Sequence, residues 1–590
     1  MGRDTQAPGG AASPPAPEPV VCELSRRGKL LVGEPYFEPR TPIVLDRKTA
    51  GDAERGDLVV VATGRGRARI ERVLGPASAI EPVLEGLLFH TGVRSWQGRA
   101  PDALREAEDL PADPSDVEPG RVDLRGLFAF TIDPDEAKDF DDAISIRQEG
   151  DGLRVWVHIA DVSRYVVPGS ALDRDAAERG LSVYVPGGVE PMLPERLSTE
   201  LCSLVPFRDR CCVTVEVPFD GDLAPGEAVF YRSVIRSSGR LTYSHVEAIL
   251  TGRERAAASL TEALRLAERV ASELRRRRYR RGALRIETGE ITFAFDGQGG
   301  VERAWVETEP LAHGLVEELM ILANEAVAQL LAGRRREALY RVHERPDPQA
   351  VELLLTKLDA LEVPTPSAPE RLTPGDAARL VARVSARVAE YVSTSRRGEE
   401  AFPALVLRSL KQARYDPRNL GHAGLASRAY CHFTSPIRRY PDVICHRALL
   451  REIGAADDPL PEDLPELAEW TSAREREAAQ VEYAADAICL AWLLERRLFE
   501  RGWDACFEGE IIGAIGSGLF VRFDGVFEGY VPARRLPGDY FELDPLGTAL
   551  VGRRTGRRYR LGDRIEVGVA SVDRAAGKAN LALCENFPSR

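Results

Sequence analysis

The densest run of negative charge is the feature that most constrains how this chain can fold. Residues 133–143 read DPDEAKDFDDA and hold five Asp and one Glu. Apolar runs typical of β-strands lie on both sides, so the loop is tied at both ends. Like charges held this close repel each other, and folding them together costs free energy unless something compensates.

A bound divalent cation would remove that repulsion. A loop between two strands can fold back so that Asp133, Asp139, Asp141 and Asp142 converge. Mg²⁺ prefers oxygen ligands and shares its coordination shell with phosphate oxygens. The cluster therefore predicts a metal site for phosphoryl chemistry, and a solvated acidic turn is the alternative.

A second motif offers phosphate-binding side chains. Residues 430–447 read YCHFTSPIRRYPDVICHR, with Arg438 and Arg439 adjacent. The planar guanidinium of Arg suits bidentate contact with phosphate oxygens. The alternative is a helix start with two exposed Arg side chains.

Patterning along the 590 residues predicts several domains, because one hydrophobic core does not serve a chain this long. Residues 1–19 are rich in Pro, Ala and Gly and indicate a disordered tail. Strand-like runs in 20–75 predict a small barrel, and 76–120 reads as a helix and a linker. Strands precede helices in 121–500, which favours an α+β domain, and 504–585 has the rhythm of a five-stranded barrel.

In one predicted strand of this last barrel, residues that would face inward alternate with residues that would face outward. Leu519, Val521 and Phe523 would fill the barrel, whereas Phe520 and Arg522 would face outward. An exposed aromatic ring beside a cation is what a stacking platform for single-stranded nucleic acid needs.

Charge and cysteine usage narrow the class of protein. The net charge of −13 argues against a surface coated in positive charge, yet it allows a local basic groove. Two Arg-rich runs, 275–285 and 552–560, could line such a groove with their Tyr stacked between cations, or could be solvated faces. No C-x-x-C pair occurs in the sequence, so we do not expect a structural zinc site. A core of this size does not need disulfides, and we therefore expect a reducing compartment, the cytoplasm.

Four ordered blocks of sequence resemble a known family. GRVDLRGLFAFTIDPDEAKDFDDA, SVYVPGGVEPMLPERLSTELCSLVP, AHGLVEELMILANEAVA and HFTSPIRRYPD are similar to the ribonuclease II and ribonuclease R exoribonucleases, and more so to ribonuclease R. The N-terminal strands resemble a cold-shock-like OB domain, and the C-terminal strands an S-one-type OB domain. The resemblance implies an α+β multidomain protein in which an RNB catalytic domain is flanked by two OB barrels.

The resemblance also implies an activity. Relatives of this kind are processive, hydrolytic 3′-to-5′ exoribonucleases that release nucleoside 5′-monophosphates from single-stranded RNA with a free 3′ end. It implies that Asp133, Asp139 and Asp142 hold Mg²⁺ and that loss of Asp141 harms catalysis most. Arg438 would contact the scissile phosphate, with Arg439 as the second candidate.

RNA-binding residues follow from the same resemblance. Tyr184 would stack on the terminal nucleotide, and Glu317 or Glu318 would accept a hydrogen bond from the ribose 2′-hydroxyl. Glu482 matches an acidic residue near the site only loosely, and a solvated helix face is the favoured interpretation.

Two other functions compete with the exoribonuclease. An RNA-binding regulator with a catalytically inactive RNB domain would have lost catalytic Asp residues, whereas all four are present here. A DNA nuclease would have no use for a 2′-hydroxyl contact.

No run of 18 apolar residues occurs, so we expect no membrane partner, and we expect a monomer.

Overall fold

The computed structural model describes residues 19–63, 68–95, 97–111, 117–286, 289–307 and 309–586. The predicted tail lies almost wholly outside these residues. The chain divides into two compact units, one of residues 1–98 with 295–300, the other of residues 99–294 with 301–590.

The first unit is a five-stranded antiparallel sheet with the strand order β3-β2-β1-β4-β5. Its interior is built from alternate residues such as Cys22, Leu24, Val59 and Val61, as the period of two predicts. A bridge between Leu45 and Ala68 links the two ends of the strand order, which gives the sheet a barrel-like form. The elements are β1 Val20–Arg27, β2 Leu30–Pro35, β3 Ile43–Val44, β4 Asp57–Ala62, β5 Arg69–Pro76 and the helix α1 Ile80–His90.

The second unit is built on a six-stranded sheet with the order β12-β9-β8-β7-β13-β6. β12 also pairs with β13, so the sheet curls on itself, and β13 runs parallel to β7 and β6. The strands are β6 Val122–Asp123, β7 Ala129–Asp133, β8 Asp142–Glu149, β9 Gly152–Ala160, β12 Asp209–Phe219 and β13 Val229–Thr242.

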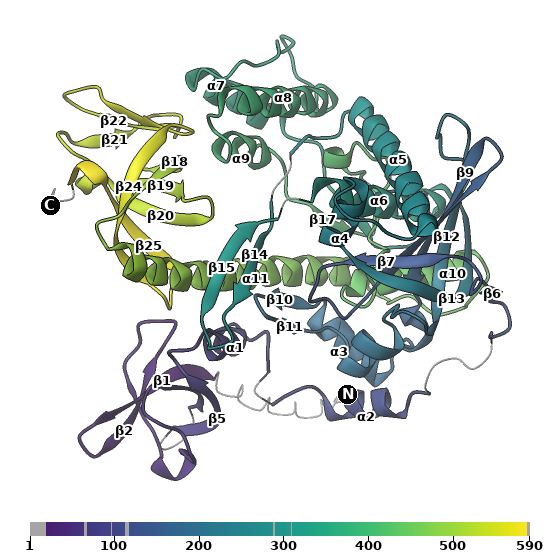
Figure 1. The fold of residues 1–590 in the computed structure, drawn as a ribbon, viewed down its shortest axis with the longest axis horizontal. Helices are drawn as coiled ribbons and strands as arrows, with labels where there is room; N and C mark the ends of the chain where they lie inside the picture. Colours follow the sequence, from purple (N-terminus) through teal and green to yellow (C-terminus); the bar gives the residue numbers. More distant parts are fainter. Residues whose placement is uncertain are drawn as a thin grey trace, which may run out of the picture. The chain divides into compact units, whose positions relative to one another are not determined.

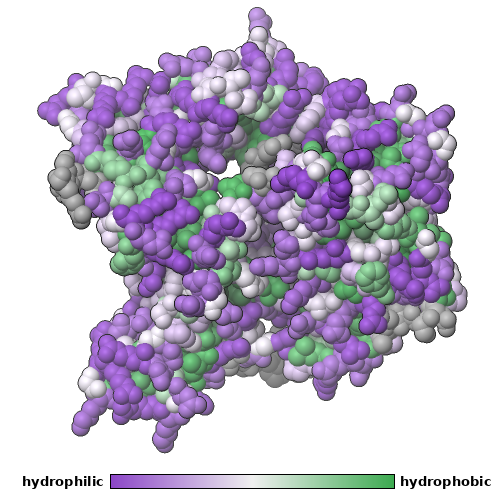
Figure 2. Space-filling model, in the orientation of Figure 1, coloured by the Kyte–Doolittle hydropathy of each residue, from purple (hydrophilic) through white to green (hydrophobic). Residues whose placement is uncertain are grey.

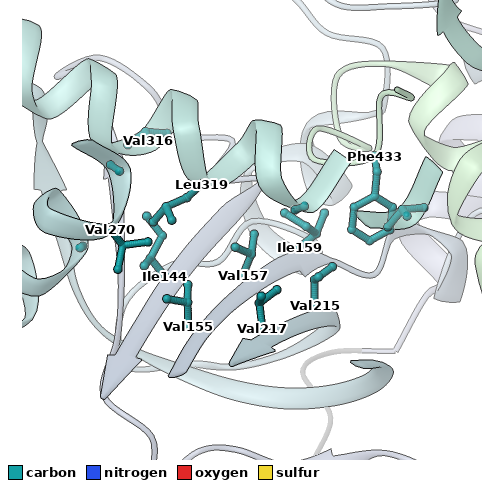
Figure 3. Close-up of a cluster of buried hydrophobic side chains, with 14 of the residues drawn as sticks. Ile144, Val155, Val157, Ile159, Val215, Val217, Val270, Val316, Leu319 and Phe433 are labelled. Carbon is teal, nitrogen blue, oxygen red and sulfur yellow. The ribbon is translucent and has the colours of Figure 1, made fainter. Parts of the chain in front are cut away.

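Helices α5 (Ala258–Arg281) and α6 (Pro310–Gly333) cover one face of this sheet. Figure 3 shows Ile144 of β8 close to Val270 of α5 and Leu319 of α6, and Val157 and Val215 belong to the same buried cluster. Burying each of these side chains stabilises the fold by about 1.5–3 kcal/mol. The α+β class predicted for this region is confirmed.

Further helices and short strands surround this core (Figure 1). The helices are α3 Ala171–Arg179, α4 Tyr243–Leu250, α7 Pro348–Ala360, α8 Pro374–Ser395, α9 Ala401–Arg408, α10 Tyr440–Glu452 and α11 Leu464–Arg501. The short strands are β10 Val183–Val185, β11 Gly188–Glu190, β14 Ile291–Phe295, β15 Val301–Val306, β16 Tyr340–Val342 and β17 Arg414–Asp416.

The segment expected to be a linker contains a helix, α2 (Pro101–Asp109). Its acidic composition hides the apolar spacing, since only Ala103 and Ala107 are buried, one helical turn apart. These two small side chains join a hydrophobic cluster that includes Leu172 and Ala176 of α3.

The C-terminal segment forms the predicted closed barrel, with the order β18-β19-β20-β25-β24. Glu510 of β18 accepts hydrogen bonds at 2.9–3.1 Å from the backbone N–H groups of Glu399, Glu400 and Ala401, at the start of α9. A carboxylate is favoured at a helix N-terminus, so this contact fixes the barrel to α9. The strands are β18 Cys506–Ile515, β19 Gly518–Phe523, β20 Phe527–Pro532, β21 Phe541–Leu543, β22 Ala549–Gly552, β23 Arg558–Arg560, β24 Arg564–Asp573 and β25 Lys578–Leu583.

One disulfide departs from the expectation that the chain needs none. Cys506, at the start of β18, is bonded to Cys584, just after β25, with the two Cα atoms 6.0 Å apart. Both strands pair with β24, so the barrel brings the two cysteines together although 78 residues separate them. The other seven cysteines are buried and free.

None of the helices in the described residues is both long enough and apolar enough to cross a bilayer. Hydrophilic side chains cover most of the face shown in Figure 2, and apolar ones are scattered between them.

Candidate active site

The acidic loop connects two neighbouring strands of the six-stranded sheet. Asp133 is the last residue of β7, and Asp142 is the first residue of β8. Because β7 and β8 are antiparallel neighbours, these two ends lie at the same edge of the sheet. Ser203 fixes the loop between them, since its Oγ donates to the Lys138 carbonyl at 2.7 Å and accepts from the Phe140 N–H at 3.0 Å.

Burial and mutual repulsion disfavour the charged form of these carboxyl groups. Burial, followed by the charge of Asp142, raises the pKa of Asp133 from 3.8 to about 7. Burial raises the pKa of Asp142 to about 6, although Arg438 opposes the shift. Burial also raises the pKa of Asp141 well above its ordinary value. Nearby cations therefore do not fully offset the negative charge of this loop.

The donor set fits a hard divalent cation. Asp133 Oδ2 is buried and accepts no hydrogen bond within the described part of the chain. Carboxylate oxygens from Asp133, Asp139 and Asp142 are the ligand type that Mg²⁺ takes. The structure describes all four Asp residues. In no group of three of them do the carboxylate oxygens, one from each residue, all lie within 4.8 Å of one another, so the cluster is more open than a closed metal site. Glu307, Glu309 and His313 meet that spacing, and they are only partly buried.

The loop before α10 packs against the acidic loop. The backbone N–H of Ile437 donates to Asp141 Oδ1 at 2.8 Å, and Arg438 Nε lies 3.4 Å from Asp141 Oδ2. The Arg438 side chain is 44% exposed, so its guanidinium is free to reach a ligand. Arg439 instead binds Asp442 through Nε and Nη2 at 3.0 and 2.8 Å. The alternative of two exposed Arg side chains is wrong for Arg439.

Tyr184 lies on β10 and touches the same site. Its hydroxyl donates to Asp139 Oδ2 at 2.7 Å, and its backbone N–H donates to Glu482 Oε1 at 2.9 Å. The backbone N–H of Ser182 donates to the Arg438 carbonyl at 3.0 Å, which joins this strand to the Arg loop. The expectation of a solvated Glu482 is wrong, because this α11 side chain supports Tyr184.

The two Glu candidates on α6 differ in their surroundings. The Glu318 side chain is 2% exposed and accepts from Arg278 Nε at 3.1 Å, whereas that of Glu317 is 52% exposed. His313 lies one helical turn before Glu317 on the same face, and its ring stacks 3.9 Å from Tyr243. Burial and the charges of the acidic loop raise the pKa of Tyr243. Thr242, the residue before Tyr243, is the strand partner of Asp133. His313 therefore lies near the acidic loop, and Glu317 follows it one helical turn later.

Tyr243 and His313 went unnoticed in the sequence, and so did Arg240. The Arg240 guanidinium donates to the carbonyl oxygens of Pro134 and Asp135, the second at 2.7 Å, and lies 5.6 Å from the centre of the Phe140 ring. Arg240 thus holds the middle of the acidic loop. No motif marks it, because the contact joins residues more than 100 positions apart.

The barrel residues follow the predicted alternation. Leu519, Val521 and Phe523 are buried, whereas Phe520 is 41% exposed. Arg522 is half-buried and paired with Glu528, so its charge is partly neutralised. In the run 552–560, Tyr559 is buried against Phe541, and Arg557 of the same run lies 5.0 Å from the centre of its ring.

Comparison with known proteins agrees with this fold. The RNB domain family matches residues 121–454, more than half of the chain, so this chain is an RNB-domain protein. Ribonuclease R of Escherichia coli K12 is 38% identical over 490 residues, which cover 80% of this chain and 58% of that protein. Ribonuclease R of Aquifex aeolicus is 34% identical over 602 residues, which cover 96% and 82%. Within the RNB family the chain belongs with ribonuclease R.

A solved structure supports the same fold. Ribonuclease R of Mycoplasma genitalium, in complex with ribose-methylated single-stranded RNA, aligns with a TM-score of 0.84 at 24% identity. The alignment covers 96% of this chain and 90% of that one. The predicted architecture and family are therefore confirmed, although this chain spans under two thirds of the Escherichia coli protein.

Proposed function

We propose that this chain is a processive, hydrolytic exoribonuclease that shortens single-stranded RNA from its 3′ end and releases nucleoside 5′-monophosphates. One observation carries the proposal. The complete set of four Asp carboxyl groups lies beside a half-exposed guanidinium, that of Arg438, and an aromatic ring, that of Tyr184. The RNA-bound relative of the same fold supports RNA as the substrate.

The acidic loop would hold Mg²⁺ through Asp133, Asp139 and Asp142. Bound there, a divalent cation polarises a phosphodiester and lowers the pKa of an attacking water. Arg438 is placed to contact the scissile phosphate and to stabilise the charge that develops on its oxygens. Asp141 keeps this guanidinium and the Ile437 N–H in position, which accounts for its expected importance.

Tyr184 and Glu317 would provide recognition of the terminal nucleotide. Tyr184 would stack on the last base, with its hydroxyl anchored on Asp139. Both Glu residues pair with Arg278, and Glu317 is the better candidate for the 2′-hydroxyl because its side chain is half-exposed whereas that of Glu318 is buried. DNA has no such hydroxyl, so we expect RNA to be degraded and DNA of the same sequence to be spared.

The direct test is to incubate the protein with 5′-labelled poly(A), with Mg²⁺ or with EDTA, and to size the products. With Mg²⁺ only, we expect the labelled chain to be converted to a short 5′-labelled limit product, while the unlabelled nucleotides removed from the 3′ end appear as 5′-monophosphates. If the RNA is bound but stays intact, the chain is an RNA-binding regulator with an inactive RNB domain. The monomeric state and the cytoplasmic location stay predictions of the sequence.

A further inference from the structure

A basic pocket lies between the end of α5 and the first half of α8, apart from the acidic loop. Its volume is about 600 Å³. Gly282 directly follows α5, and a Cβ atom there would lie 4.0 Å from that of Ala382 on α8, so the end of α5 contacts α8 (Figure 1). Five guanidinium groups line the pocket: those of Arg280, Arg281, Arg285, Arg379 and Arg383.

Most arginines of the Arg-rich run on α5 are paired with carboxylates, including those at the pocket. Arg277 pairs with Glu273 at 2.7 Å, and Arg278 pairs with Glu318, so the first turns of the run are balanced by carboxylates. Arg280 and Arg281 line the pocket, but they also pair with Glu273 at 3.2 Å and with Glu325 at 3.0 Å. The interpretation of a solvated helix face thus applies only to part of the run.

Positive charge exceeds negative charge at the pocket. Asp376 is the only carboxylate among the lining residues, and Arg379 binds it at 2.7 Å. Over the described ranges, Arg285 and Arg383 have no carboxylate oxygen within 4.0 Å, and both are exposed. These two guanidinium groups are therefore available to an anion.

Arg285 is also held in place before any ligand arrives. Its guanidinium lies 4.8 Å from the centre of the Tyr279 ring, and its backbone N–H donates to Ser385 Oγ of α8 at 3.1 Å. Stacking on an aromatic face orients a guanidinium without neutralising its charge. A fixed, unneutralised guanidinium loses little conformational entropy when it binds a phosphate.

We propose that this pocket binds the phosphates of an RNA chain at a distance from its 3′ end, as a second contact outside the acidic loop. The inference rests on the proposed function for its choice of anion. A phosphodiester chain fits because its charges are spaced along a line, and the pocket offers charges from two elements rather than one cage. Only RNA long enough to span both sites would use this contact.

The test compares wild type with the variant Arg285→Ala, Arg383→Ala, using 5′-labelled oligoadenylates of 20 and 4 nucleotides. Binding is measured by filter retention in EDTA, which prevents turnover, over a series of KCl concentrations. We expect the dissociation constant of the 20-mer to rise about 5- to 20-fold, and its log–log salt dependence to fall by about 1.4, for two lost phosphate contacts on a single strand. Binding of the 4-mer, and its cleavage with Mg²⁺, should not change.

Arg387→Ala is the matched control, because Arg387 lies on α8 outside the pocket and pairs with Glu390 at 2.7 Å. If the double variant is less stable than wild type, the single variant Arg383→Ala is used for the same binding comparison. The proposal for the pocket is overturned if the double variant binds the 20-mer as tightly as wild type does. It is also overturned if the variant loses affinity for the 20-mer and the 4-mer by the same factor. If wild type cleaves no RNA, the proposed function fails, while the binding comparison in EDTA still decides the pocket.

Discussion

The charge of Asp133 should destabilise the protein whenever no cation is bound, and Asp133→Asn should remove that effect. The carboxyl group sits at the end of β7, where burial and Asp142 raise its pKa from 3.8 to about 7. A carboxyl group with a raised pKa in the folded state keeps its proton there after the unfolded chain has lost it. The free energy of unfolding therefore falls as pH rises from about 4 to about 7.

The size of the effect follows from the shift. Each pH unit well below the folded-state pKa costs about 1.4 kcal/mol, and the slope halves at the pKa, so wild type should lose about 2 kcal/mol between pH 5 and pH 7 through this one group. Asp133→Asn lacks the group and should not show this part of the pH dependence. The buried amide carries its own cost of about 1–3 kcal/mol, but that cost is the same at each pH and cancels from the comparison.

Urea denaturation in EDTA at pH 5 and at pH 7–8 measures the difference, with Asp135→Asn, an exposed carboxylate on the same loop, as the control. Wild type and the control should lose stability relative to Asp133→Asn as pH rises. Mg²⁺ at pH 8 should then stabilise wild type and the control more than Asp133→Asn, since a ligand of the folded state stabilises it by mass action. Parallel pH dependence in wild type and Asp133→Asn would refute the electrostatic reasoning.

Three further predictions concern the proposed reaction. Asp141→Asn should slow degradation of a labelled oligoribonucleotide by at least about 10³-fold, equivalent to about 4 kcal/mol, with binding near normal; undiminished turnover would contradict its role. Tyr184→Ala should lengthen the limit product, whereas Tyr184→Phe should isolate the contribution of the hydrogen bond to Asp139; an unchanged product ladder for Tyr184→Ala would show that Tyr184 only packs. Arg240→Lys should lower kcat and leave KM for RNA little changed, because a lysine cannot hold both loop carbonyls; equal kcat values would rule out a positioning role.

Periodic features of the sequence predicted the fold well. The alternation around Phe520 predicted which residues fill the C-terminal barrel, and the strand-like runs of 20–75 predicted the N-terminal barrel-like sheet. In both patterns the spacing of apolar residues shows which face is buried, and this spacing can be seen within a short segment of sequence. The helix α2 was missed for the same reason, since two alanines are too weak an apolar signal in an acidic segment.

The partners of the site residues could not be predicted, because they come from distant segments. Glu482 supports Tyr184 across 298 positions, and Arg240 holds the acidic loop across more than 100. No spacing rule links such pairs. The different surroundings of Arg438 and Arg439 arise from their places at the start of α10, where only Arg439 is turned toward Asp442.

The contacts within the second unit imply that the site and the C-terminal barrel are positioned together. Glu482 and Tyr483 are adjacent on α11: the first accepts from the Tyr184 N–H, and the hydroxyl of the second donates to Glu528 of β20 at 3.3 Å. Glu528 also pairs with Arg522, beside the exposed ring of Phe520 on β19. One rigid helix thus contacts the strand that carries the proposed stacking residue and the barrel strand next to the proposed RNA-binding face. An RNA chain that runs from that face to the acidic loop would therefore reach Tyr184 over a path of fixed length, which positions its end for the reaction.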